Sequence, residues 1–384
     1  MPPRDAGRIC QVEINHGEFW PTLRGKRVGF IDGGVANLEA VGAAPVAIRV
    51  GSYTVIPGDT GDQREQFRFE RQLIGELFST SATQQGFFDD LSEDPAPLRD
   101  VARFCLEVAG AQAAATTNPP PDWLLLHGPL VNPVAMYDRV PNFSTDGLNS
   151  LLPAAEVTGR TGKHTHFISV YRRQLELLRD SAARVCGVVE RASGSRLVAS
   201  TLLNELAEAG HIDASFRDYA GARLNEYRIA DALLFQVVLE PGEYLQPVTI
   251  DRNDVRRAPT EWQEFIGAYP KPRVSFVNVS DVAQPLRVEC FDKLPADEYP
   301  ALFGLVVHSA RLLPRYAFPA GLDIVDKHAK LPDWLAKPIN SRLATQMLRK
   351  AIEVANKEGE PRLLTAMWQL LAGTTRDFFF RPKA

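Results

Sequence analysis

The sequence is poor in cysteine, and the few it has are scattered. Cys10, Cys105, Cys186 and Cys290 show no Cys-x-x-Cys spacing, which zinc ribbons and redox motifs require. A disulfide or zinc framework is therefore not indicated. We expect reduced, mostly buried thiols, as in a cytosolic protein.

Long apolar runs and an excess of charge are also missing. No apolar run approaches the roughly 20 residues that span a bilayer, and the first residues lack the apolar core of a signal peptide. The net charge is only −4 over 384 residues, so any contact with nucleic acid must come from a local patch. We expect a cytoplasmic protein without membrane contact.

Three common catalytic motifs are absent from the sequence. There is no dinucleotide-binding fingerprint and no Gly-x-Ser-x-Gly elbow. The segment 159–164 approaches a P-loop, but it lacks the first glycine at the required spacing and a Ser or Thr after Lys163. The chemistry must therefore come from another kind of site.

What is present is an alternation of apolar segments and amphipathic ones. Strands are expected at 28–32, 46–50, 53–56, 123–127 and 185–189 and within 228–250 and 273–290; helices are expected at 63–80, from Pro97, at 167–182, 197–209 and 301–313, and after 332. The first three strands predict an antiparallel meander. This order predicts an α/β fold, a ribonuclease-H-like mixed β-sheet flanked by helices, with a helical C-terminal extension.

Four residues are candidate ligands for divalent metals, because metal-dependent phosphodiester cleavage needs several such side chains in one pocket. Asp32 is expected at a strand end, where Gly33 and Gly34 would let a backbone or a phosphate come close. The other three are Glu107 within a helix, His127 at a strand end and Asp326 beyond Phe318-Pro319. Each has an ordinary alternative: a tight turn at Asp32, a helix-surface acid at Glu107, a strand-terminal polar residue at His127 and a solvated acid at Asp326.

Cationic residues flank the expected strand ends. Lys163, Arg191 and Arg196, together with Arg172 and Arg173, could grip a phosphate backbone. A solvated charged surface is the alternative for each of them.

Six landmarks, taken in order, resemble the NurA family of prokaryotic DNA-end nucleases. They are Ile31-Asp32-Gly33-Gly34, the helical Glu107, Leu126-His127-Gly128-Pro129-Leu130, Gly187-Val188-Val189-Glu190-Arg191, the segment 229–243 with Leu239-Glu240-Pro241-Gly242, and 318–327 with Phe318-Pro319 and Asp326. The resemblance implies a nuclease domain over 27–330, between a lead-in at 1–26 and the helical extension at 331–384. It also implies a homodimer, manganese-dependent cleavage of DNA and partnership with the hexameric ATPase HerA.

The chain departs from the pattern of that family at several positions. The family usually has Asp where this chain has His127 and Tyr where it has Phe318, and it often has Lys at Glu190. At Asp326 the family commonly has His, so the first and last changes could compensate. Mn²⁺ tolerates a set of three acids and one imidazole.

The resulting hypothesis is a Mn²⁺- or Mg²⁺-dependent deoxyribonuclease that acts with a HerA-type ring ATPase, in DNA end resection or anti-phage defence. Asp32, Glu107, His127 and Asp326 would be both catalytic and metal-binding, and Lys163, Arg191 and Arg196 would bind DNA. One rival is a weak or inactive scaffold that binds the ATPase ring and guides DNA. Another is an unrelated enzyme with a ribonuclease-H fold, which leaves the Leu-Glu-Pro-Gly and Phe-Pro landmarks unexplained.

Overall fold

The structure is a computed structural model. It describes residues 7–12, 15–36, 45–77, 86–89, 95–192, 194, 197–250, 255–313 and 317–332, together with isolated helical positions between 338 and 365. The helical extension expected at 331–384 therefore lies almost wholly outside the described residues.

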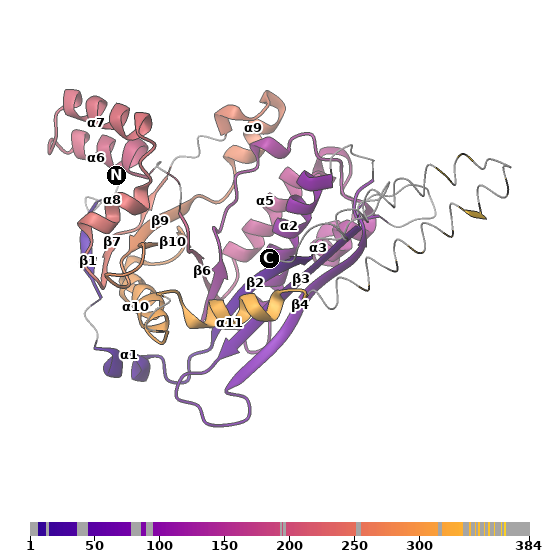
Figure 1. Ribbon diagram of the computed structural model, residues 1–384, viewed down its shortest axis with the longest axis horizontal. Helices are drawn as coiled ribbons and strands as arrows, with labels where there is room; N and C mark the ends of the chain where they lie inside the picture. The colour runs from indigo at the N-terminus through magenta and orange to yellow at the C-terminus, as the bar shows by residue number, and fades with distance from the viewer. Residues whose placement is uncertain are drawn as a thin grey trace.

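One mixed sheet of ten strands runs through the described chain (Figure 1). Its strands are β1 (Ile9–Gln11), β2 (Val28–Ala36), β3 (Pro45–Val55), β4 (Glu65–Glu76), β5 (Trp123–His127), β6 (Arg184–Val189), β7 (Glu243–Leu245), β8 (Val248–Thr249), β9 (Pro272–Val277) and β10 (Leu286–Phe291). Their order is β1-β7-β9-β10-β6-β5-β2-β3-β4, and β8 pairs with β9. The lead-in residues thus contribute the edge strand β1, which pairs with β7.

Strand direction divides the sheet. β2, β3 and β4 form an antiparallel meander, whereas β5 and β6 run parallel to β2. β10, β9, β7 and β1 continue the sheet with antiparallel pairs. The parallel pairs require crossover connections, and helices supply them.

The helices are α1 (His16–Thr22), α2 (Pro95–Ala115), α3 (Thr145–Leu151), α4 (Ala154–Val157), α5 (Phe167–Arg179), α6 (Leu203–Glu208), α7 (Ala214–Glu226), α8 (Asp231–Val238), α9 (Thr260–Gly267), α10 (Tyr299–Ala310) and α11 (Ala320–Ala329). Short 3-10 turns lie at Ala135–Tyr137, Gly162–Thr165, Val255–Arg257 and Ala296–Glu298, and a π-helical turn lies at Val198–Leu202. Among the described residues, no helix is long and apolar enough to cross a membrane.

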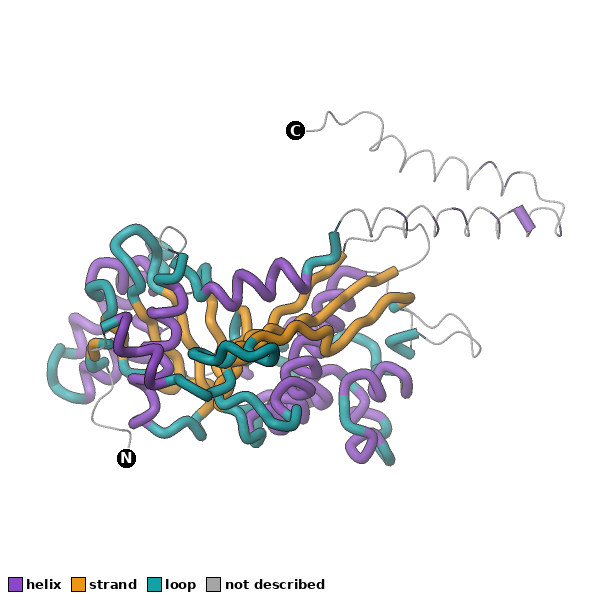
Figure 2. The backbone as a smooth tube through the Cα atoms, turned by 90° about the horizontal axis from the view of Figure 1, so that it is seen from below, coloured by secondary structure: helices purple, strands orange, loops and turns teal. Residues whose placement is uncertain are grey.

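Strand alternation assigns the helices to the two faces of the sheet. Ile31 and Leu124 pack in one core cluster with residues of α2 and α5. Their neighbours Phe30 and Leu125 pack in another, with residues of α10 and α11. Successive side chains of a strand point to opposite faces, so α2 and α5 cover one face and α10 and α11 the other. Figure 2 shows helices on both sides of the strands.

The structure corrects three sequence predictions. Residues 63–80 were expected to be helical, but Glu65–Glu76 is the edge strand β4. The segments 46–50 and 53–56 are one strand, β3. Within 228–250, expected to hold strands, Asp231–Val238 is helix α8, and only short strands follow it. A mostly exposed edge strand such as β4 has no clear period of two, and a short apolar run fits a buried helix as well as a strand.

Candidate metal centre

Asp32 lies in the middle of β2, not at a strand end as predicted. It pairs with Gly51 of β3, and β2 continues for four residues beyond it. Its side chain is 9% exposed, and its Oδ1 accepts a 2.8 Å hydrogen bond from the backbone N–H of Gly33. Because Phe30 shares its face of the strand, Asp32 faces the side covered by α11.

The two glycines after Asp32 make room for other parts of the protein. A Cβ built at Gly33 would lie 2.5 Å from Cγ of Glu107, on α2. A Cβ at Gly34 would collide with the backbone of Ala329, at the end of α11. The Asp-Gly-Gly step therefore lets a helix approach β2 closely on each face, which is how glycine is used at close backbone contacts.

His127 and Asp326 converge on Asp32 from two other elements. His127 ends β5, as predicted, and its Nδ1 lies 3.2 Å from Oδ2 of Asp32. Asp326 lies in the last turns of α11. One ligand atom from each of the three residues lies within 4.8 Å of the others, a separation that a shared metal ion can bridge. The ring of buried Phe318 lies 5.1 Å from that of His127.

The protonation of this group reflects burial and mutual contact. Burial raises the pKa of Asp32, and a contact with the Asp326 carboxyl raises it further, although His127 and the Gly33 N–H oppose this. Burial lowers the pKa of His127, but the hydrogen bond and charge of Asp32 outweigh it, with help from Asp326, so the net pKa is raised. Asp32 and His127 thus each raise or lower the pKa of the other through their direct contact.

Glu107 approaches the same part of β2 from the other face. Its side chain is 16% exposed, and its Oε1 accepts a 3.0 Å hydrogen bond from Nη1 of Arg103, one turn earlier on α2. Burial raises its pKa to about 7, with the charge of Asp32 adding to the effect and Arg103 opposing it. The predicted fourth ligand is therefore near the other three but paired with a cation.

The donor set fits a divalent cation. Two carboxylates held in contact repel each other when both are ionised, and a cation between them would remove the penalty. Carboxylate oxygens with one imidazole suit Mn²⁺, and Mg²⁺ also takes carboxylates. Asp32, His127 and Asp326 are the residues that would hold such an ion.

The structure does not gather the predicted DNA-binding residues that it describes, Lys163 and Arg191, into one cluster, as it does the metal-ligand candidates. Arg191 is exposed two residues beyond β6, whose Val188 pairs with His127, so it follows a strand that ends at the same edge of the sheet as His127. Lys163 lies in a 3-10 turn, where its Nζ is 3.3 Å from Glu261 and faces the ring of Trp262. Arg196 lies outside the described residues.

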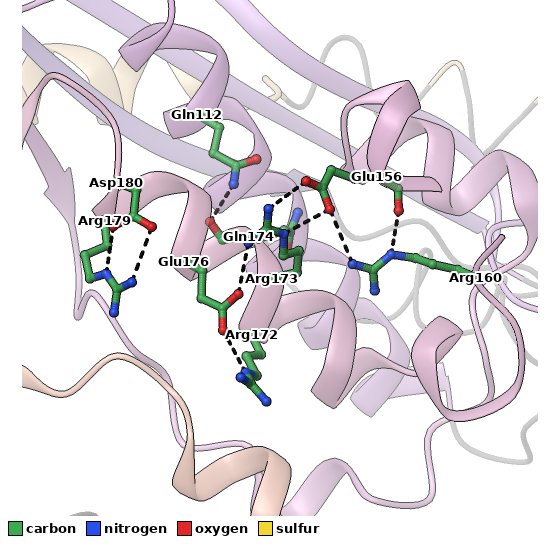
Figure 3. A network of polar contacts seen from close by, with 9 residues as sticks. All are labelled: Gln112, Glu156, Arg160, Arg172, Arg173, Gln174, Glu176, Arg179 and Asp180. Atoms are coloured by element: carbon green, nitrogen blue, oxygen red, sulfur yellow. Dashed lines mark hydrogen bonds and ion pairs between the residues drawn. The ribbon is translucent and has the colours of Figure 1, made fainter. Parts of the chain in front are cut away.

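The two further arginines, Arg172 and Arg173, are engaged by acids on α4 and α5. Arg172 donates to Glu176, and Arg173 donates to both Glu156 and Glu176 (Figure 3). Both guanidinium groups are thus held in ion pairs within the protein, so the structure favours a structural role for both arginines.

Sequence reasoning missed two cations beside the site. Arg103 precedes Glu107 by four residues, and Lys330 follows Asp326 by four and contacts its Oδ2. A spacing of four on a helix places opposite charges side by side. The Arg103–Glu107 spacing was readable because a helix was expected from Pro97, whereas no helix was expected over 320–329, where α11 carries Asp326.

Comparison with solved structures finds similar folds. The crystal structure of the NurA nuclease from Sulfolobus solfataricus matches with a TM-score of 0.50 and 12% identity, over 85% of each chain. NurA bound to dAMP and manganese matches with a TM-score of 0.40 and 9% identity, over 80% of this chain and 85% of that one. No protein-family model and no curated protein matches the sequence.

The chain therefore has a mixed α/β fold. In particular, its fold is similar to that of the Sulfolobus solfataricus NurA nuclease. The resemblance to NurA predicted from six landmarks is confirmed at the level of the fold.

Proposed function

We propose that this protein is a metal-dependent deoxyribonuclease. The observation that carries the proposal is the convergence of Asp32, His127 and Asp326 from three separate elements in a fold similar to a NurA nuclease. A buried acid such as Asp32, held in contact with a second acid, weakens a fold unless a cation offsets its charge. Their placement is therefore best explained by a cation.

We further propose that residues 27–330 form the nuclease domain around a ribonuclease-H-like core. The strand order β4-β3-β2-β5-β6, with an antiparallel meander followed by two parallel strands, supports this. So does the helix α2, which carries Glu107 between the meander and β5.

Each site residue has a proposed role. Asp32, Asp326 and His127 hold Mn²⁺ or Mg²⁺, and Glu107 is the fourth ligand once its carboxylate leaves Arg103. A pKa of about 7 leaves Glu107 partly protonated at neutral pH, and a nearby cation would favour its carboxylate form. A bound divalent metal supplies charge stabilisation at the phosphate and an activated water.

The substrate is proposed to be DNA. Arg191 is exposed beyond the end of β6, the strand that pairs with the one carrying His127, which suits a contact with phosphate. Lys163 and Arg196 remain proposed contacts, and Lys163 would first have to leave Glu261. From the resemblance we also propose a homodimer that works with a HerA-type ring ATPase, in DNA end resection or anti-phage defence. The cytoplasmic location expected from the composition remains a proposal.

A second candidate is a weak or inactive scaffold that guides DNA for the ring ATPase. Two observations favour it: Glu107 is held by Arg103, and Phe318 offers no hydroxyl beside His127. The test is cleavage of single-stranded DNA, double-stranded DNA and RNA with Mn²⁺, Mg²⁺ or EDTA, alone and with a HerA-type ATPase. A nuclease cleaves DNA with metal, and Asp32→Asn abolishes the activity. DNA binding without cleavage under every condition would support the scaffold.

A further inference from the structure

The last turn of α11, which carries Asp326, is fastened to β3 by one side chain. Arg49 donates from Nη2 to the carbonyl oxygens of His328, at 2.8 Å, and Lys330, and from Nε to that of Ala329, at 3.2 Å. The last carbonyls of a helix have no partner within the helix. A guanidinium at this end satisfies them and complements the helix dipole.

The guanidinium of Arg49 is itself supported by an aromatic stack. It lies 4.4 Å from the ring centre of Phe69, and Phe69 stacks on His328 with 4.4 Å between ring centres and 8° between planes. Gly51 leaves the space for the His328 ring, because a Cβ there would lie 2.9 Å from it. These contacts give a structural reason for a phenylalanine at position 69 of the edge strand β4, although Phe69 is 51% exposed.

The contacts continue from Arg49 to the metal-ligand group. Arg49 holds the Lys330 carbonyl, the Lys330 N–H donates to the Asp326 carbonyl at 3.0 Å, and the Lys330 amine contacts Oδ2 of Asp326. Lys330 therefore contacts both the backbone and the carboxylate of Asp326, and Arg49 holds Lys330 in place through its carbonyl oxygen.

We propose that Arg49, supported by Phe69, is a positioning residue that sets the place of Asp326 for metal binding. The inference rests on the proposed metal centre. Partners behind the ligands of a metal typically change affinity by about 10- to 100-fold when they are removed.

The experiment is titration of full-length protein with Mn²⁺, with melting temperature recorded for each variant. Arg49→Ala is expected to weaken Mn²⁺ binding about 10-fold at temperatures well below its melting transition, and Arg49→Lys is expected to lose less. Unchanged affinity in a folded Arg49→Ala protein would overturn the proposal, whatever happens to its melting temperature.

Phe67 offers a matched control for Phe69. Both lie on β4, are about equally exposed at 50% and 51%, and contact the His328 ring, but only Phe69 lies against Arg49. Phe69→Ala is expected to weaken Mn²⁺ binding and Phe67→Ala to leave it unchanged. Combining Phe69→Ala with Arg49→Ala should add little, since residues of one unit are not additive. Equal losses in the two phenylalanine variants would overturn the assignment.

Asp32→Asn separates this inference from the proposed function. If Asp32→Asn binds Mn²⁺ as well as the wild type does, or if neither protein binds it, the proposed metal centre is wrong and the positioning role falls with it. If Asp32→Asn loses the ion but Arg49→Ala retains full affinity, only the positioning role is wrong.

Discussion

Glu107 occupies the space that a side chain at Gly33 would need: a Cβ built at Gly33 lies 2.5 Å from Cγ and Oε1 of Glu107. The contact joins the middle of β2 to α2, directly beside Asp32. It explains glycine at this position without any requirement for an unusual backbone angle. The conformation of Glu107 therefore depends on the absence of a Cβ at Gly33.

Gly33→Ala is therefore expected to displace Glu107 and to reduce nuclease activity at least tenfold, since misplacement of a site residue by about 1 Å is costly. Gly75→Ala is the matched control, because Gly75 also lies in a strand but has nothing within 4 Å of an added Cβ. The measurement is the rate of DNA cleavage with Mn²⁺. Wild-type activity in Gly33→Ala would mean that the position of Glu107 is unimportant.

Asp32→Asn is expected to lower DNA cleavage by orders of magnitude, because it removes a charged ligand while keeping the shape. The melting temperature should stay the same or rise, since burial already disfavours the charged form of Asp32. Cleavage assays and thermal melts of the metal-free protein check both. Cleavage at the wild-type rate would contradict the proposed metal centre.

His127 tests whether an imidazole replaces a carboxylate as ligand. His127→Ala should weaken Mn²⁺ binding, and His127→Asp should retain it. In the wild type a proton on His127 competes with the metal, and its raised pKa means that affinity should increase as pH rises through and above 6.5. In His127→Asp this dependence should move to lower pH. If both variants match the wild type in metal affinity and rate, His127 is a bystander.

Glu107 should make stability depend on pH in the absence of metal. Its pKa is about 7 in the folded protein against an ordinary value of 4.5, so the folded state binds more protons than the unfolded state between these values. Stability should therefore fall as pH rises from about 4.5 to about 7, by roughly 3 kcal/mol at most. Denaturant unfolding in EDTA, with Glu107→Gln compared to wild type, isolates this contribution. Parallel pH profiles for the two proteins would show that Glu107 has an ordinary pKa.

Arg191 should contact phosphate if DNA reaches the metal-ligand group along β6. Removing one such contact should reduce the log–log salt dependence of DNA binding by about one unit, and removing Arg196 as well should reduce it by about two. Arg173→Gln is the control, because Arg173 is held in ion pairs with Glu156 and Glu176. Binding is measured with catalysis blocked by Asp32→Asn. An unchanged slope in Arg191→Ala would place this residue away from the DNA.

The sequence by itself determined the segments that carry the candidate ligands. The strand at 123–127 ends on His127 and the helix after Pro97 carries Glu107, both as predicted, because apolar periodicity and breakers are local signals. Six short landmarks in order were sufficient to indicate a NurA-like fold. The composition also excluded a long apolar membrane helix among the described residues.

Only the tertiary structure decided how these residues meet. The sequence placed Asp32 at a strand end, but pairing with β3 extends β2 past it. Gly33 and Gly34 leave space for Glu107 of α2 and for the backbone of α11. Residues 65–76 looked helical because a mostly exposed edge strand shows no clear alternation, and pairing with β3 overrode that local pattern. The contact of Arg49 with the end of α11 joins residues about 280 positions apart. No local pattern encodes such a contact, because it exists only after the sheet and α11 have packed together.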